Sequence, residues 1–236
     1  VVVMNIIKTL KYGPATTFDG GVLWREQIRK RLGQLLMDQP PATPAALRRF
    51  IVGRIKNVTG IPRLPVRARL LDERACSGFR LQRIVFDAVQ GWTVGLDLFL
   101  PPGRGPFQAI LCPCGHGPKW QADHQIPPQV LARNGFAAAL FDMPMFGERT
   151  RDNDHFIQGP QSQLTGQPSL FYFLIDVLRT ADYLETRPDI DASRGFGMTG
   201  VSGGGTLTML APHADPRLRV IVPVCCVVSL NDHIAG

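Results

Sequence analysis

Apolar and polar residues follow two different rhythms along this chain, and the change falls near residue 81. Before it, apolar residues recur at helical spacing in Trp24–Met37 and in Ala45–Val58, and prolines interrupt both stretches. From Leu81 onward the apolar residues come in short runs that favour β-strands. The pattern therefore predicts a helical N-terminal extension over 1–80 and a sheet-containing domain over 81–236.

The runs after Leu81 predict an ordered series of strands and helices. Two β-rich runs flank Gln90-Gly91, which predicts a hairpin. Beyond it strands and helices alternate, as is typical of a mostly parallel sheet with helices on both faces. The expected strands are Leu81–Val89, Trp92–Leu100, Gln108–Cys112, Phe136–Phe141, Gly195–Thr199 and Arg219–Val224, and the expected helices are Asp123–Asn134, Ser169–Thr186 and Gly203–Leu210.

The composition suits one large domain, or one domain with an appendage. The 236 residues are 44% hydrophobic and 19% charged, which excludes a mainly disordered chain. Apolar stretches such as Val220–Val228 fall far short of the ~18 residues that a membrane span needs, so we expect no such span. Because the first residue is Val1 rather than Met, we expect the native N-terminus to lie upstream, and the sequence assigns no compartment.

The net charge of +7 comes from the N-terminal part of the chain. Between Arg25 and Arg83, twelve arginines and two lysines stand against four acidic residues. Nucleic-acid binding is one interpretation of such a segment. The basic residues are scattered and no aromatic platform accompanies them, so we favour a solvated helical extension and expect no nucleic-acid partner.

The cysteines and a glycine motif raise two cofactor interpretations that we set aside. Five cysteines make an odd count and favour free thiols, and Cys112-Pro113-Cys114-Gly115-His116 lacks the four-ligand spacing of a zinc site. The run Gly195–Gly200 matches G-x-G-x-x-G, but its glycines lie within a predicted strand rather than after one. We therefore expect neither a metal nor a dinucleotide cofactor.

One serine lies in a G-x-S-x-G motif, Gly200-Val201-Ser202-Gly203-Gly204, between a predicted strand and a predicted helix. This is the context that a nucleophilic serine of this type requires, since a sharp turn lifts its hydroxyl clear of the sheet. Gly200 and Gly204 allow the neighbouring turns to approach, and the N–H of Gly203 points to the place where an oxyanion forms. An ordinary Gly-Ser loop is the alternative, which the flanking elements disfavour.

A second loop, Gly115–Lys119, follows another predicted strand and is placed to donate the second oxyanion N–H. Pro118 has no N–H, which leaves Gly117, His116 and Lys119 as donors. His116 is also a candidate for the catalytic base. The chain order serine, acid, histidine in serine hydrolases of this architecture argues against that role.

A third loop begins with Asp142 and leaves the same edge of the predicted sheet, where open α/β folds build their sites. A catalytic acid is one interpretation of this carboxylate. We favour a carboxylate that orders the loop.

Over about Leu81–Leu230, the chain resembles the α/β-hydrolase superfamily, and within it acetyl xylan esterases and dienelactone-hydrolase-like esterases. Several ordered motifs at matching intervals carry this resemblance. They are Gly115–Lys119, Asp142 with Gly147-Glu148-Arg149, the set Asp176, Leu178, Arg179, Asp182, Tyr183 and Leu184, the run Arg187–Asp191, Arg194, and Gly200–Gly205.

The resemblance implies an α/β-hydrolase three-layer sandwich and hydrolysis of carboxylic esters through an acyl-enzyme, with no cofactor. Ser202 is similar to the nucleophile of the family, Gly203 to one oxyanion donor, and Gly117 to the other. The partner would be a small ester, and acetylated sugars, lactones and peptides are all substrates of this scaffold. The basic extension is similar to one that many such esterases carry.

The acid and the histidine of a triad are missing from the matching positions. His213 would lie ~16 Å along a helix from Ser202, and Asp232 beside His233 is an awkward pair. In the resembled family these residues follow two further strands that we do not find. We therefore expect a fragment that ends before the last two strand–helix units, with little esterase activity of its own. An inactive scaffold of the same fold is the alternative.

Overall fold

A computed structural model describes residues 65–149 and 169–226 of the chain, together with Lys30, Thr43, Ala45, Gln161 and Leu164. Apart from Lys30 and Thr43, these residues belong to one compact unit, Pro44–Val227. Of the two expected N-terminal helices, Trp24–Met37 and Ala45–Val58, the structure describes only Lys30 and Ala45, which are both helical, and the remaining residues lie outside the described ones. Within the described part, no helix is both long enough and apolar enough to cross a membrane.

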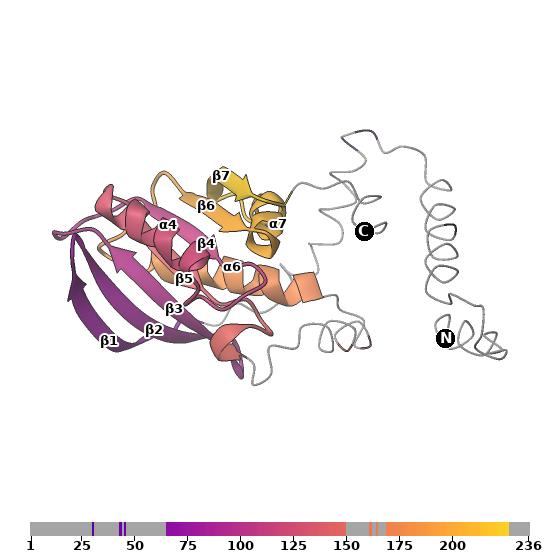
Figure 1. The fold of residues 1–236 in the computed structure, drawn as a ribbon, viewed down its shortest axis with the longest axis horizontal. Helices are drawn as coiled ribbons and strands as arrows, with labels where there is room; N and C mark the ends of the chain where they lie inside the picture. Colours follow the sequence, from indigo (N-terminus) through magenta and orange to yellow (C-terminus); the bar gives the residue numbers. More distant parts are fainter. Residues whose placement is uncertain are drawn as a thin grey trace, which may run out of the picture. The chain divides into compact units, whose positions relative to one another are not determined.

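The centre of this unit is a seven-stranded sheet in the order β1-β2-β3-β5-β4-β6-β7 (Figure 1). The first three strands and β5 pair antiparallel, whereas β5, β4, β6 and β7 are parallel to one another. The strands are β1 Arg69–Cys76, β2 Phe79–Val89, β3 Trp92–Leu100, β4 Ala109–Pro113, β5 Ala137–Phe141, β6 Phe196–Val201 and β7 Leu218–Val224.

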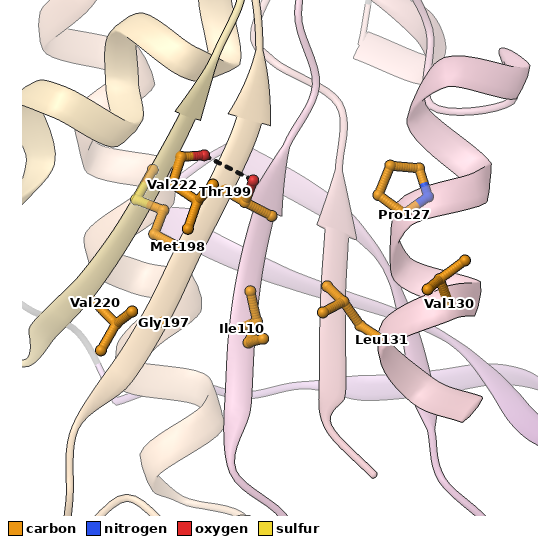
Figure 2. Close-up of a pocket in the computed structure, with 9 residues that line it drawn as sticks. All are labelled: Ile110, Pro127, Val130, Leu131, Gly197, Met198, Thr199, Val220 and Val222. Carbon is orange, nitrogen blue, oxygen red and sulfur yellow. Dashed lines mark hydrogen bonds between the residues drawn. The ribbon is translucent and has the colours of Figure 1, made fainter. Parts of the chain in front are cut away.

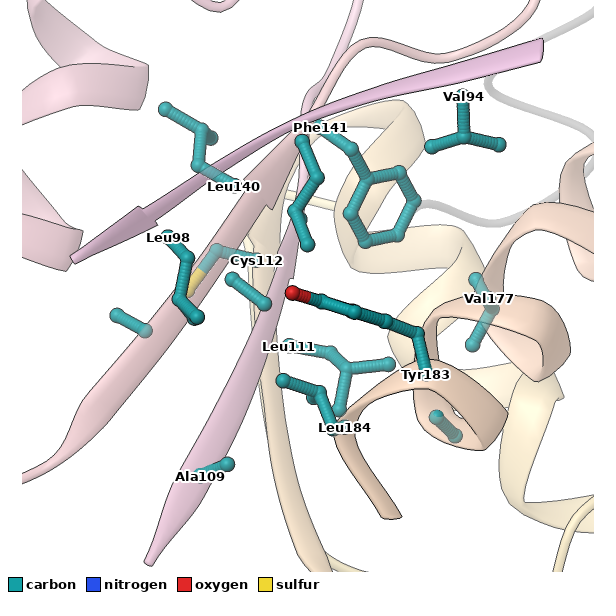
Figure 3. Packing of buried hydrophobic residues seen from close by; sticks show 14 of the residues in the cluster. Val94, Leu98, Ala109, Leu111, Cys112, Leu140, Phe141, Val177, Tyr183 and Leu184 are labelled. Carbon is teal, nitrogen blue, oxygen red and sulfur yellow. The ribbon is translucent and has the colours of Figure 1, made fainter. Parts of the chain in front are cut away.

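Three α-helices cover the two faces of the sheet. Helix α4, Ala122–Arg133, lies on the face to which Ile110 of β4 points, and Gly135, at φ +91°, follows its end. Helix α6, Ser169–Glu185, lies on the opposite face against Leu111, and it contacts α7, Gly203–Leu210 (Figures 1 and 3). Residues 65–149 and 169–226 also contain two short 3₁₀ turns, η1 Gly147–Arg149 and η2 Ala211–His213.

The core lies between the central strands and α6. Every residue of β5 is buried, and Leu98, Leu111 and Phe141 are almost fully removed from solvent. Figure 3 shows Tyr183 and Leu184 of α6 packed toward Leu111. Continuous apolar runs such as that of β5 are typical of strands covered on both faces, and the β5 run predicted its strand for this reason.

The described elements confirm the expected three-layer α/β arrangement, including the hairpin at Gly91, which has φ +75°. Strand β1 is a difference, because it lies in the stretch that the sequence assigned to the helical extension. Its residues are mostly exposed and carry no alternation of apolar and polar positions, so the pattern gave no strand signal. The sheet therefore begins at Arg69 rather than at Leu81.

The β7 side of the sheet is much less covered than its centre. Val220 and Val222 are 66% and 57% exposed. Together with Ile110, Met198 and residues of α4, they line an apolar groove of about 360 Å³ on the α4 face (Figure 2). Neither Ser202 nor the loop 115–119 lines this groove, so it is separate from the serine-containing turn.

Candidate active site

Ser202 occupies the turn between β6 and α7. Its backbone has φ 55° and ψ −115°, a conformation that side-chain-bearing residues rarely adopt. The main chain of the turn is held from β7, since the N–H of Ser202 donates to the carbonyl of Val224 at 2.9 Å. The side chain is half-buried rather than covered, so the strained turn presents the hydroxyl at the carboxyl end of the sheet.

Two glycines make this turn possible because main-chain atoms approach them closely. A Cβ at Gly200 would lie 2.7 Å from the carbonyl carbon of Gly204, and one at Gly204 would lie 2.3 Å from the carbonyl oxygen of Pro113. Any larger residue would collide with backbone at either place. The expected role of both glycines in the approach of neighbouring turns therefore has a direct geometric basis.

Gly203 is the first residue of α7, so its N–H belongs to the group that has no acceptor within the helix. It lies directly after Ser202, at the helix end that favours negative charge. The loop after β4 lies against the same place, because a Cβ at Gly203 would be 3.1 Å from Cε1 of His116. The first residue of α7 and the loop after β4 therefore lie side by side next to Ser202.

His116 is brought to the serine by the loop after β4. Its Nδ1 lies 3.1 Å from Oγ of Ser202, and its ring packs against Phe146 in a T-shaped contact with 5.8 Å between the ring centroids. The sequence offered His116 both as an oxyanion donor and as a base. The structure places the imidazole of His116 in contact with the hydroxyl of Ser202.

Asp142 joins the loop after β4 to the loop after β5. Its Oδ1 accepts the N–H of Lys119 at 2.6 Å and its Oδ2 accepts the N–H of Glu148 at 3.1 Å. Burial raises the pKa of this carboxyl, and the two N–H donors oppose the rise. Both oxygens bind main chain, which is the geometry of the loop-ordering interpretation. The N–H of Lys119 is thereby engaged and is unsuited to bind an oxyanion.

The side chain of Lys119 provides a second tie that the sequence did not reveal. Its Nζ is buried and lies 3.1 Å from Oδ1 of Asp97 and 3.2 Å from Oε2 of Glu148. Arg83 also pairs with both carboxylates. A buried ammonium needs such partners to offset its desolvation. The ion pairs link the loop after β4 to strand β3.

The Gly147-Glu148-Arg149 motif continues this linkage to the opposite face of the sheet. Arg149 forms an ion pair with Asp176 of α6, and Nε1 of Trp92 donates to the same carboxylate at 3.0 Å. Burial raises the pKa of Asp176, and the Arg149 guanidinium opposes it. Motif residues that are far apart in sequence are thus held together around the loops that flank Ser202.

The remaining candidates lie apart from the serine or outside the described residues. His213 is exposed in η2, and Asp232 and His233 fall in a stretch that the structure does not describe. All five cysteines are free thiols; only Cys112 and Cys114 are buried, and burial raises the pKa of Cys112 to about 12. No cluster of three or more metal-ligating side chains occurs among the described residues.

Comparisons with known proteins give a fold but no family by sequence. No family model matches the chain, and no curated protein matches it. The chain is similar in structure to a methylesterase, at 24% identity and a TM-score of 0.64 over 87% of this chain and 46% of that one. It is also similar to an acetyl xylan esterase from Paenibacillus sp. R4, at 21% identity and a TM-score of 0.58 over 81% and 63% of the two chains.

A glucuronoyl esterase from Solibacter usitatus aligns at 16% identity with a TM-score of 0.51, over 72% of this chain and 55% of that one. The chain therefore has the α/β-hydrolase fold, and these three structural neighbours are esterases. The resemblance to acetyl xylan esterases that the motifs indicated is confirmed as a likeness of fold. The chain spans between 46% and 63% of the length of these three solved structures.

Proposed function

We propose that the protein hydrolyses carboxylic esters, with Ser202 as the nucleophile. The observation that carries the proposal is the strained turn at Ser202, with φ 55°, between a parallel strand and a helix. Such strain costs free energy of order 1–3 kcal/mol and persists where the surrounding structure enforces it, typically at active sites. The esterases among the structural neighbours support the same class of reaction.

In the proposed reaction, Oγ of Ser202 attacks the ester carbonyl carbon while its proton passes to a base. The carbonyl oxygen becomes an oxyanion that the N–H groups of Gly203 and Gly117 bind. Collapse of the intermediate expels the alcohol, which leaves with a proton, and an acyl-serine remains. Water then attacks the acyl group, the carboxylic acid departs, and Ser202 regains its hydrogen. The sequence of steps needs no cofactor.

For the second oxyanion donor we retain Gly117. Among the loop positions, the N–H of Gly115 donates to His124 and that of Lys119 to Asp142, while Pro118 has none. The N–H of Gly117 has no acceptor among the residues that the structure describes. The N–H of Gly117 could therefore bind an oxyanion at no loss of an existing hydrogen bond.

We propose His116 as the residue whose Nδ1 accepts the hydrogen bond of the Ser202 hydroxyl in the resting site. The 3.1 Å separation of the two atoms supports this assignment. In the resembled family, the triad histidine follows the serine in the chain. If His116 only accepts this hydrogen bond, a different histidine acts as the base, whereas His116 could also be the base itself. Substitution of His116 distinguishes these two roles.

The substrates that we propose are small esters, with acetylated sugars as the first class to test. Methyl esters, lactones and peptides belong in the same panel, because one fold hosts all of these activities. In the complete gene product, we expect S202A to lose hydrolysis by at least about 10³-fold relative to the parent. Ser193→Ala is the matched control, since Ser193 is an exposed serine before β6, at the other end of that strand. Parental rates in S202A would refute the proposal.

A catalytically inactive scaffold of the same fold is the second candidate. The observation in its favour is that no histidine among the residues described after Ser202 contacts its hydroxyl, since His213 is exposed in η2. Absence of hydrolysis of every ester, lactone and peptide in the panel by the folded complete protein would favour the scaffold over the enzyme.

A further inference from the structure

A buried histidine that none of the steps above uses holds the loop 115–118 by both of its ring nitrogens. His124 lies in the first turn of α4 and is 6% exposed. Its Nε2 lies 2.9 Å from the main-chain nitrogen of Gly115, and its Nδ1 lies 3.1 Å from the carbonyl oxygen of Pro118. One imidazole thus spans the segment that contains His116 and Gly117.

The two partners fix the protonation of the ring. The N–H of Gly115 can only donate, so Nε2 must accept, whereas the carbonyl of Pro118 can only accept, so Nδ1 must carry the hydrogen. A neutral ring with its hydrogen on Nδ1 satisfies both contacts. In an imidazolium the Nε2 hydrogen would face the hydrogen of Gly115. Asp123, an exposed neighbour, has its Oδ1 at 3.9 Å from Nδ1, which is too long for a hydrogen bond.

The start of this loop leaves little room for movement against the serine turn. A Cβ at Gly115 would lie 2.5 Å from the carbonyl oxygen of Val201 and 3.3 Å from Cβ of Ser202. A shift of Gly115 away from His124 therefore changes the distance between the loop and the nucleophile. At the other end of the loop, Lys119 is fixed independently through Asp142, at 2.6 Å. His124 thus holds Gly115, the end of the loop that lies against the serine turn.

We propose that His124 is a positioning residue of the ester-hydrolysing site: its neutral ring sets the loop 115–118 so that the Gly117 N–H and the His116 ring meet Ser202. This inference rests on the proposed function. It adds that a residue outside substrate contact determines the rate of the chemical step, because an oxyanion donor acts only when it is aimed at the oxyanion.

Three substitutions of His124 separate positioning from support of the fold. In His124→Gln, the amide oxygen reaches as far as Nε2 and still accepts from Gly115. In His124→Asn, the amide nitrogen replaces Nδ1 and donates to Pro118, but the Gly115 contact is lost. His124→Phe keeps the ring volume and loses both contacts.

Steady-state kinetics of the complete gene product on an ester that the parent hydrolyses are the first test. We expect kcat to fall about 10–100-fold in H124F and H124N with KM within about twofold, and H124Q to recover kcat to within about fivefold of the parent. His213→Phe, at an exposed histidine in η2, should leave kcat unchanged. Unchanged kcat in folded H124N, or equal losses in H124N and H124Q, would overturn the proposal.

Two further measurements distinguish failure of the proposed role of His124 from failure of the proposed esterase function. S202A is measured in parallel: full activity there overturns the function itself, whereas an inactive S202A with an unaffected H124N overturns only the positioning role. Nitrogen-15 NMR of the His124 ring at neutral pH needs no activity. We expect a neutral ring protonated at Nδ1, and an Nε2-protonated ring or an imidazolium would contradict the proposal.

Discussion

The two sides of the sheet differ in how completely they are covered. Around the carboxyl ends of β4, β5 and β6, backbone atoms leave no room for a Cβ at Gly200 or Gly204, and the buried Lys119 is paired with carboxylates. Along β7, Val220 and Val222 are mostly exposed and line an apolar groove (Figure 2). Close packing is thus concentrated around Ser202, where we expect larger side chains to be poorly tolerated. On the β7 side, we expect substitutions to be tolerated better.

Truncation of buried and exposed apolar residues should measure this contrast most directly. Leu111 of β4 is 0% exposed, so L111A should lower the free energy of unfolding by about 2–5 kcal/mol. V222A on β7 removes little buried surface and should cost about 1 kcal/mol or less. Urea unfolding of both variants of the present chain checks the difference. Equal losses would show that β7 is as well packed as β4.

Added methyl groups should distinguish the tightly packed serine turn, tested at Gly204 of α7, from the groove side of β6, tested at Gly197. G204A places Cβ 2.3 Å from the backbone oxygen of Pro113, so we expect a loss of about 1–3 kcal/mol in stability. G197A faces the groove, where Cβ meets only the side chain of Ile110 at 3.1 Å, and should cost less. Thermal unfolding of the pair is the measurement. A G204A protein as stable as the parent would disprove the tight approach of α7 to β4.

Substitution of His116 should test its contact with the hydroxyl. H116F removes the acceptor of the Ser202 hydrogen bond, so phosphonate labelling of Ser202 should slow about tenfold, equivalent to about 1.4 kcal/mol. H116N keeps an oxygen near the position of Nδ1 and should label faster than H116F. A loss of about 10² or more in both variants would identify a general base. Equal labelling of the parent and H116F would show that the contact contributes nothing.

Asp142 should give the smallest effect, a pH dependence of stability. Burial raises the pKa of its carboxyl in the folded state, so the folded protein binds this proton more tightly than the unfolded one. The resulting stabilisation is full below the ordinary aspartate pKa of about 4 and is lost as the pH rises through the folded-state value. Unfolding of the parent and D142N between pH 4 and pH 8 should show a larger fall in the parent, because the buried Asp176 contributes a similar fall to both proteins. Parallel curves would contradict the assignment.

The sequence predicted those parts of the fold that depend on local pattern. The buried runs of β4 and β5 predicted strands because both of their faces are covered, and the Ser202 motif predicted a turn because of its flanking elements. Strand β1 was missed, since its mostly exposed residues leave no apolar alternation. A strand at the edge of a sheet that is stabilised by hydrogen bonds to one neighbour, and whose side chains are exposed, needs no alternation of apolar and polar residues.

The sequence could not predict contacts whose partners are main-chain groups or distant charges. Nothing in its neighbourhood marks His124, because its two partners are backbone atoms of a loop that only folding brings to α4. Burial of Lys119 with Asp97 depends on β3 lying beside β5 in the sheet. The contact of His116 with Ser202 joins residues 86 positions apart, and the sequence indicated His116 only as a candidate oxyanion donor or base.

Covalent labelling at Ser202 tests the central claim most directly. The complete gene product is incubated with a fluorophosphonate and digested, and its peptides are analysed by mass spectrometry. We predict one adduct, on the Ser202 peptide, present in the parent and in S193A and absent from S202A. An adduct on another residue, or ester hydrolysis that continues at the parental rate in S202A, would contradict the account.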